Sequence, residues 1–323
     1  MNSLEEQLDG VKSVAVAGHV KPDGDCVGSC LATYNYIKNY DPAIQVRVFL
    51  EPIPNIFKFL SGADVIESEP DASMRFDLMI VQDCGDAGRL GKASVLLAQA
   101  KRVICIDHHI SNTGFGDDRY IFPKASSTSE LVFELMDKTK ITRQVAECIY
   151  TGIIHDTGLF QYSSTSPKTM RTAAFLMEQG IAFTEIIDKT YVQKTFEQNQ
   201  ILARAIEKSR LHLGGACISS IITIEDMEQC HVLAKHLEGI VAQLRSIKGV
   251  EAAVFFYPQQ TESGLEYKIS LRAASDVVNV AQIAMHYGGG GHVRAAGAST
   301  RMEPQACLFE ILEMVRQQME HTT

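Results

Sequence analysis

The sequence has no cluster of five or more basic residues, no apolar run long enough to span a membrane and no CxxC pair. Its 30 Lys and Arg are outnumbered by 39 Asp and Glu, which gives a formal net charge of −9. Binding of a long nucleic-acid duplex depends on many cations that neutralise phosphates, so this composition argues against such a partner. A short nucleotide held by a few well-placed groups is not excluded. The surplus of carboxylates also fits a site for divalent cations.

The absence of a long apolar run argues against a membrane partner, because a spanning helix needs roughly 18 apolar residues or more. The first ten residues, MNSLEEQLDG, are acidic and polar, which is unlike a secretory signal. We therefore expect a cytoplasmic protein.

Cysteine usage points to a reducing compartment rather than to a disulfide framework. The eight cysteines are Cys26, Cys30, Cys84, Cys105, Cys148, Cys217, Cys230 and Cys307. Most lie inside apolar runs such as VICI, which is typical of reduced core cysteines. Cys26 and Cys30 are four residues apart and Cys26 follows Asp25, so a redox or ligand role stays open for this pair.

The order of apolar patterns predicts an α/β fold. Short apolar runs at 13–18, 45–50, 78–81 and 103–106 read as strands, and helical patterns such as 27–39 and 92–100 separate several of them. Strands that alternate with helices predict a mostly parallel sheet flanked by helices.

The second half of the chain predicts a smaller α/β domain. Helical patterns follow residue 126, at 129–138, 142–154, 167–179 and 192–209. Strand patterns then return at 216–223, 251–257 and 266–272, with helices near 231–246, 276–286 and 304–319. We predict a catalytic domain over 1–190 and a substrate-binding domain over 191–323, with the boundary inside the helical stretch 185–205.

Proton-transferring and metal-ligating residues follow three of the predicted strands. They are His19, Asp23 and Asp25 after the first, Asp83 after the third, and Asp107, His108 and His109 after the fourth. Because the carboxyl ends of parallel strands lie along one edge of a sheet, these groups are expected to converge. His155 and Asp156 follow an apolar helix and are further candidates.

Each of these groups has a structural explanation when taken alone. Asp23 precedes a glycine as in a turn, Asp25 could cap a helix, and Gly158 could end one. Together, however, so many carboxylates at one edge would repel each other unless cations or hydrogen bonds compensate. Carboxylates with one or two imidazoles suit Mn²⁺ or Mg²⁺, whereas the Cys or three-His spacing of most zinc sites is absent.

Four segments, HVKPDGD, QDCGD, DHHISN and HDTGLF, resemble in this order the motifs of the DHH phosphoesterase superfamily. The match is closest to its NrnA-type oligoribonucleases and pAp phosphatases. The resemblance implies two Mn²⁺ ions, for which Mg²⁺ or Co²⁺ could substitute. The first would be held by His19, Asp23 and Asp83. The second would be held by Asp25, Asp83, His108 and Asp156.

The same resemblance assigns the catalytic residues, which are His109, Asp107 and Asp83. His109 would face the scissile phosphate, Asp107 would orient the neighbouring histidines, and Asp83 would bridge the two ions.

A glycine run near the C-terminus, HYGGGGHVRAAGAS, resembles the GGGH motif of the DHH-associated C-terminal domain. The resemblance implies that a loop grips a terminal phosphate or a base across an interdomain cleft. The implied substrate-binding residues are Arg272, Gly289, Gly290, Gly291 and His292, to which we add Asn112. A flexible surface turn is the structural alternative for the glycines, and Arg294 could equally lie on the surface.

By this resemblance the protein hydrolyses short oligoribonucleotides (nanoRNA) and linear dinucleotides such as pApA to mononucleotides, and removes the 3′-phosphate of pAp. Fixing both substrate ends would favour lengths of two to about five nucleotides. A homodimer is expected. The alternatives are a stand-alone cyclic di-AMP phosphodiesterase, a pyrophosphate or polyphosphate hydrolase, a non-catalytic nucleotide sensor, and a protein that binds long single strands.

Overall fold

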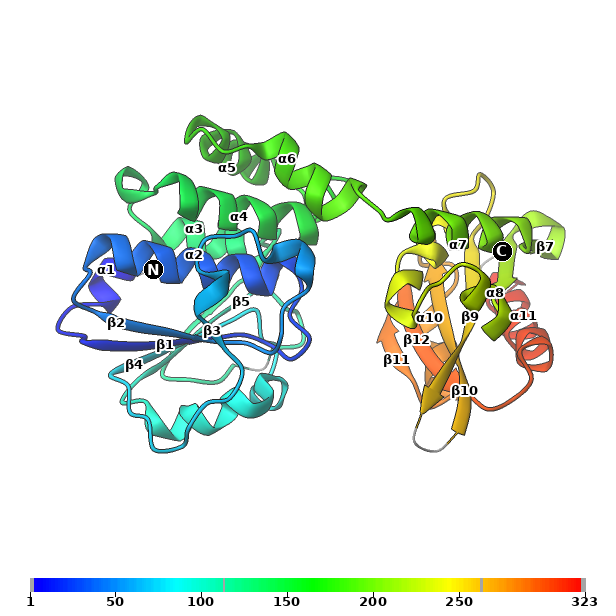
Figure 1. Cartoon of the computed structure of the whole chain (residues 1–323), viewed down its shortest axis with the longest axis horizontal. Coiled ribbons are helices and arrows are strands. Elements are labelled where there is room, and N and C mark those ends of the chain that lie inside the picture. The colour runs from blue at the N-terminus through cyan, green and yellow to red at the C-terminus, as the bar shows by residue number, and fades with distance from the viewer. Residues whose placement is uncertain (1–2, 113, 262–263, 321–323) are drawn as a thin grey trace. The chain divides into compact units, whose positions relative to one another are not determined.

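The structure, a computed structural model, describes residues 3–112, 114–261 and 264–320. It divides into two compact units, the first ending at Gln193 and the second beginning at Lys194 (Figure 1). This division lies three residues after the one predicted from the sequence. Both units combine a sheet with helices, so the α/β class is confirmed.

The sheet of the first unit has six strands that all run parallel. They are β1 (Ser13–Ala17), β2 (Gln45–Phe49), β3 (Ile66–Glu67), β4 (Leu78–Gln82), β5 (Val103–Asp107) and β6 (Asp118–Ile121). Their order is β3-β2-β1-β4-β5-β6. The four long apolar strands were predicted. The edge strands β3 and β6 were not, because they are short and only partly buried.

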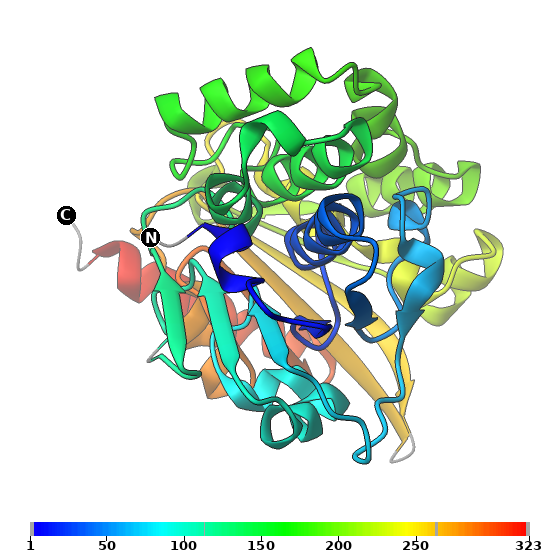
Figure 2. The same ribbon diagram turned by 90° about the vertical axis from the view of Figure 1, so that its left-hand side faces the viewer.

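Helices cover both faces of this sheet (Figure 2). One face carries α1 (Leu4–Gln7), α2 (Gly24–Tyr40), α3 (Thr128–Leu135) and α4 (Arg143–Asp156), which share a core with Val14, Val16 and Ile80. The other face carries the 3₁₀-helical run η3 (Ala87–Gln99), which packs on the alternate strand residues. Gly91 interrupts this run at φ 55°, and the segment predicted as an α-helix at 92–100 is 3₁₀-helical up to Gln99.

The remaining elements of the first unit are shorter or lie beyond these layers. They are η1 (Asn55–Phe57), η2 (Ala63–Val65), η4 (Lys138–Lys140), α5 (Pro167–Glu178), α6 (Phe183–Ile187) and the π-helical turn η5 (Asp188–Val192).

Helices α2 and α4 touch backbone to backbone through two glycines. A Cβ on Gly28 would lie 2.6 Å from the Cys148 carbonyl oxygen, and one on Gly152 would lie 1.9 Å from Ser129 Oγ. Only glycine allows such an approach. The contact sets α2, α3 and α4 close together near the ends that carry the candidate ligands.

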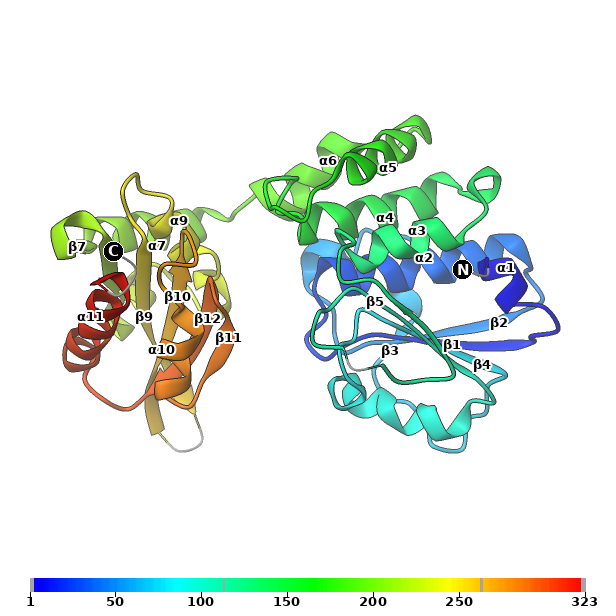
Figure 3. The same cartoon turned by 180° about the vertical axis from the view of Figure 1, so that it is seen from behind.

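The second unit has a mixed sheet in the order β11-β12-β10-β9-β8-β7 (Figure 3). Its strands are β7 (Arg210–His212), β8 (Cys217–Ile221), β9 (Ala252–Thr261), β10 (Gly264–Ala273), β11 (Gly290–His292) and β12 (Ala295–Thr300). Only the β8–β9 pair is parallel among the strand pairs of this described sheet. The short strands β7, β11 and β12 were not predicted.

Helices again cover both faces of this second sheet. One core includes α7 (Phe196–Glu207), α8 (Ile224–Gln229), η7 (Ala234–Leu237) and α9 (Ile240–Arg245), and the other includes α10 (Val280–His286) and α11 (Pro304–Glu320). The turn η6 (Leu213–Gly215) joins β7 to β8. Gly239 at φ 85° breaks the single helix predicted at 231–246.

An ion-pair cluster fixes α8 to α7 in this unit. Asp226, whose side chain is 7% exposed, accepts hydrogen bonds from Arg204 and Lys208. It also accepts one from the Thr223 backbone at 2.9 Å.

Candidate active site

The candidate ligands gather where the strand order of the first sheet reverses. β1 lies between β2 and β4: the chain runs outward from β1 to β3 on one side, then crosses to β4 and continues to β6 on the other. Ligands of open parallel sheets bind outside the carboxyl ends of strands at such a switch point. His19 follows β1, Asp83 follows β4 and Asp107 ends β5, so three neighbouring strands deliver side chains to this edge.

Asp83 occupies a strained position. Its φ is 54°, in the left-handed region that non-glycine residues rarely adopt. Its backbone N–H donates to the Ile106 carbonyl of β5 at 3.1 Å, and its side chain is only 3% exposed. Strain of this kind concentrates at functional sites, because the surrounding structure must hold it in place.

His19 presents its Nε2 atom to two carboxylates. Its Nδ1 lies 2.8 Å from the Val20 carbonyl oxygen, which can only accept, so Nδ1 carries the proton. Nε2 then lies 3.4 Å from Asp83 and 3.6 Å from Asp23. Asp23 is also the N-cap of α2, and its side chain is 63% exposed.

His108 is oriented by the same device on the other side of Asp83. Its Nδ1 lies 3.3 Å from the Ala125 carbonyl oxygen. Its Nε2 therefore faces Asp156 at 3.2 Å, Asp83 at 3.7 Å and Asp25 at 3.9 Å. A backbone carbonyl that fixes the tautomer in this way is typical of metal-binding histidines.

The N-terminus of α3 holds the buried carboxylates in place. The Thr128 and Ser129 backbone N–H groups donate to Asp25 at 2.6 and 2.9 Å, and the Thr128 hydroxyl donates to Asp83 at 3.1 Å. These amides have no partner within the helix, so an anion satisfies them well. Sequence reasoning missed them, although Ser127 before an apolar helical pattern signals an N-cap.

His109 is held by a buried carboxylate. Its Nδ1 donates to Asp107 Oδ1 at 2.7 Å, and this hydrogen bond raises the pKa of His109. Asp107 itself is fully buried. With Nδ1 engaged, Nε2 of His109 is the ring nitrogen left for a substrate.

Asn112, predicted as a substrate-binding residue, is hydrogen-bonded within the protein. Its amide nitrogen donates to Asp107 Oδ2 at 2.6 Å and to the Cys84 carbonyl at 3.2 Å, while its oxygen accepts from the Gly114 N–H at 2.8 Å. Both polar atoms of the amide therefore have partners inside the protein. The geometry is that of a residue that positions Asp107.

The electrostatics of this edge call for cations. Burial, together with the charges of Asp83 and Asp156, raises the pKa of Asp25 well above its usual value, and burial raises that of Asp156 to about 6. No Lys or Arg in the part of the chain that the structure describes is ion-paired with Asp23 or with these three carboxylates. Imidazole lone pairs and uncompensated carboxylates are the donor set that divalent metals take.

Three overlapping groups of side chains could each hold a metal ion, with ligand atoms within 4.8 Å of one another. They are His19, Cys26 and Asp83; Asp83, His108 and His109; and Asp25, His108 and Asp156. Asp83 belongs to two of these groups but not to that of Asp25, His108 and Asp156, and Asp23 belongs to none, so the bridging role and the two ligand sets stay predictions. The sequence left a ligand role for Cys26 open, and the structure places this buried thiol beside His19.

The predicted substrate-binding residues of the second unit lie on its sheet. Arg272 lies in β10 opposite Ala295 of β12, and its guanidinium donates to the Leu271 carbonyl at 2.9 Å. Gly290–His292 form the edge strand β11 rather than the expected loop. Arg294 is exposed and paired with Asp276 at 2.7 Å, which fits the surface alternative.

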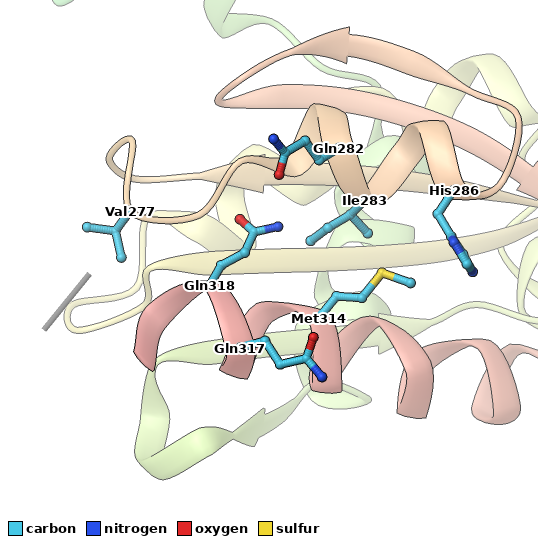
Figure 4. A pocket seen from close by; sticks show the side chains of 7 residues that line it. All are labelled: Val277, Gln282, Ile283, His286, Met314, Gln317 and Gln318. Atoms are coloured by element: carbon cyan, nitrogen blue, oxygen red, sulfur yellow. The ribbon is translucent and has the colours of Figure 1, made fainter. Parts of the chain in front are cut away.

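A pocket of about 490 Å³ lies elsewhere in the second unit, between α10 and α11 (Figure 4). Val277, Ile283 and Met314 give it apolar walls, and the remaining lining residues are three glutamines and one histidine. It contains no carboxylate, so it lacks the chemistry of the edge described above.

Comparison with known proteins identifies the family of this chain. Residues 13–153 match the DHH family, N-terminal domain, and residues 221–321 match the DHHA1 domain. The chain belongs to the DHH phosphoesterases. It is therefore a hydrolase that acts on phosphoric esters, and enzymes of this family depend on metal ions.

Several curated relatives of this DHH protein align over most of its length. The bifunctional oligoribonuclease and PAP phosphatase NrnA of Thermus thermophilus is 27% identical over 99% of this chain and 94% of that protein. The Bacillus subtilis protein of the same name is 28% identical over 87% of each chain. A crystal structure of an exopolyphosphatase-related protein from Bacteroides fragilis superposes with a TM-score of 0.88 at 25% identity, covering 98% of this chain and 95% of that one.

Within residues 3–112, 114–261 and 264–320, no helix combines the length and apolar character that crossing a membrane requires.

Proposed function

We propose that this DHH hydrolase cleaves short oligoribonucleotides and linear dinucleotides such as pApA to mononucleotides, and that it also removes the 3′-phosphate of pAp. The observation that carries the proposal is the pair of imidazole–carboxylate groups around Asp83, with His109 beside them. The names of the Thermus and Bacillus relatives, which align over nearly their whole length, supply the substrate class.

The site would hold two divalent ions, for which Mn²⁺ is the proposed metal because imidazole nitrogens join the carboxylates. The first would be held by His19, Asp23 and Asp83, and the second by Asp25, Asp83, His108 and Asp156. Such a metal pair supplies an activated water and neutralises charge that develops on the phosphate during in-line displacement.

The chain's own residues would position the reacting phosphate. Asp107 holds the His109 ring through Nδ1, so Nε2 is directed away from that hydrogen bond and can donate to a phosphate or leaving-group oxygen. Asp107 is held in turn by Asn112. The α3 amides hold Asp25 in its orientation.

The second unit would bind one end of the substrate through Arg272, His292 and the glycines at 289–291. Binding at both ends favours short substrates, because a longer chain loses one of the two contacts. Equal turnover of a dinucleotide and a twenty-mer would contradict this part of the proposal. We also predict a homodimer and a cytoplasmic location. Sedimentation of the purified protein would test the oligomeric state.

Product analysis tests the function directly. Purified protein with Mn²⁺ would be incubated with pApA, a five-mer RNA, pAp and cyclic di-AMP, and Asp83→Ala would serve as the control. We expect AMP from the first three substrates and none from the variant. Cleavage of cyclic di-AMP at a rate comparable to that of pApA would instead favour the alternative function, a cyclic di-AMP phosphodiesterase. No product from any of the four substrates would refute the proposal.

A further inference from the structure

The turn that follows Asp156 has an unusual backbone. Gly158, Leu159 and Phe160 have φ values of 54°, 56° and 65°, so three successive residues lie in the left-handed region. Two of them carry side chains that disfavour it. Backbone strain that persists beside a candidate site indicates a conformation maintained for a purpose.

Thr157 maintains this conformation through its backbone and hydroxyl. Its carbonyl oxygen accepts from the N–H groups of Gln161 at 2.9 Å and of Tyr162 at 3.0 Å. Its hydroxyl accepts from the Phe160 N–H at 3.1 Å and donates to the Ile153 carbonyl at 2.6 Å. The turn is therefore tied to the last turn of α4, which carries Asp156.

The turn folds Tyr162 back over Gly158. A Cβ on Gly158 would lie 2.5 to 2.8 Å from ring atoms of Tyr162. The ring therefore packs against the glycine, and any side chain at position 158 would displace it. Phe160, by contrast, packs into the core and against Tyr150 at 6.3 Å between ring centroids. The phenol ring of Tyr162 is thus supported on one side while 59% of the residue stays exposed.

The turn brings Tyr162 back to the end of α4 that carries Asp156, through the Tyr162 N–H bond to the Thr157 carbonyl. Tyr191 packs on His155 at 4.9 Å, and its hydroxyl donates to the His155 carbonyl at 3.5 Å. The Tyr162 ring contacts Gly158, which follows Asp156 by two residues. An exposed aromatic ring therefore lies against the turn that directly follows a candidate metal ligand.

We propose that Tyr162 is a substrate-binding residue that stacks on a nucleobase attached next to the scissile phosphate. This inference rests on the proposed function and deepens it, because it says which part of a nucleotide the first unit recognises. Stacking involves the π-face that every base has, so the contact tolerates any base but requires one. It would favour nucleotides over pyrophosphate or polyphosphate, which offer no ring.

Kinetics of Tyr162→Ala and Tyr162→Phe test the stacking. The loss of one stacked base corresponds to about a 5- to 150-fold change in binding. We expect Tyr162→Ala to raise KM for pApA by a factor in this range with little change in kcat, and Tyr162→Phe to behave as the unmodified protein. On an abasic dinucleotide, Tyr162→Ala and the unmodified protein should have equal KM. Thermal unfolding of each variant would check that it is folded.

A binding measurement separates this inference from the proposed function. The chain has no tryptophan, so Tyr162→Trp introduces a single indole fluorophore. Tyr40→Trp is the matched control. Tyr40 is also partly exposed, but it lies at the C-terminal end of α2, whereas the candidate ligands Asp23 and Asp25 lie at the N-terminal end of that helix. AMP should quench the indole at position 162 and not the one at position 40, and ribose 5-phosphate should quench neither.

The outcomes are distinct. An unchanged KM of Tyr162→Ala for pApA, or an indole at position 162 that AMP does not quench, would overturn the stacking role even if pApA is cleaved. A protein that cleaves no nucleotide but whose indole at position 162 is quenched by AMP would refute the proposed function while the stacking inference stands.

Discussion

Replacement of Asn112 by alanine separates two roles for this residue. The substitution removes a donor that lies 2.6 Å from Asp107 Oδ2, and Asp107 is fully buried. A hydrogen bond to a charged group contributes about 1.5 to 3 kcal/mol, and its loss leaves that oxygen without compensation from water. The substitution also releases the Cys84 carbonyl and the Gly114 N–H.

The consequence should appear in kcat rather than in KM. Without Asn112, Asp107 loses one of the two side chains that fix it, and His109 loses its orientation. A cost of about 1.5 to 3 kcal/mol corresponds to roughly a 10- to 150-fold decrease in rate, similar to the effect of losing other partners of ligating side chains. We expect kcat for pApA to fall by this factor while KM changes little.

The assay is steady-state hydrolysis of pApA with saturating Mn²⁺, together with urea unfolding of each protein. Ser111→Ala is the control, because Ser111 is the exposed neighbour of Asn112 on the same loop. A raised KM with unchanged kcat would refute the positioning role and restore the direct substrate contact that the sequence suggested. Unchanged kcat and KM would refute both roles.

Three further predictions concern packing and charge. Gly152→Ala should abolish activity and destabilise the protein by about 1 to 3 kcal/mol, because the added Cβ would lie 1.9 Å from Ser129 Oγ. Adding Ser129→Gly to this variant should recover part of the lost stability, measured by urea unfolding. Asp226→Asn should destabilise the protein by about 2 kcal/mol at pH 7, because its two cationic partners outweigh burial and lower the pKa of Asp226 to about 2. A carboxylate whose pKa is lowered by folding stabilises the folded state above about pH 4 and loses this effect as the pH falls toward 2. The difference in unfolding free energy between Asp226→Asn and the unmodified protein should therefore shrink between pH 4 and pH 2 in urea unfolding, and a constant difference would contradict this cause. Gly291→Ala should lower the melting temperature and Gly290→Ala should not, since only the former would place a Cβ 2.4 Å from the Ala295 carbonyl oxygen.

The sequence predicted the parts of the fold that depend on long apolar patterns. β1, β4 and β5 are almost wholly buried apolar strands and β2 is buried over its last two residues, and helices flank their sheet. The pattern failed where a single glycine decides the backbone. Gly239 lies at positive φ and breaks the helix predicted at 231–246, although the apolar spacing continues across it. Strands of two to four residues carry too few side chains to show alternation.

The sequence also indicated which side chains gather at the sheet edge, since that follows from the direction of parallel strands. It could not show how they are held. The α3 amides that bind Asp25 and the hydrogen bond from Asn112 to Asp107 are backbone or loop contacts without a residue pattern. The position of Cys26 beside His19 likewise depends on how α2 packs against β1.

The glycine run shows how one pattern can serve two purposes. Four consecutive glycines favour a loop that approaches a ligand, yet the run continues into an edge strand. Gly289 and Gly291 lie so close to β12 that a Cβ would come within 2.2 and 2.4 Å of its carbonyl oxygens, so protein packing alone explains them. Gly290 has no atom within 4 Å of its Cβ position. A ligand that requires glycine in this strand must therefore approach at Gly290, with the exposed His292 two residues further along the same edge.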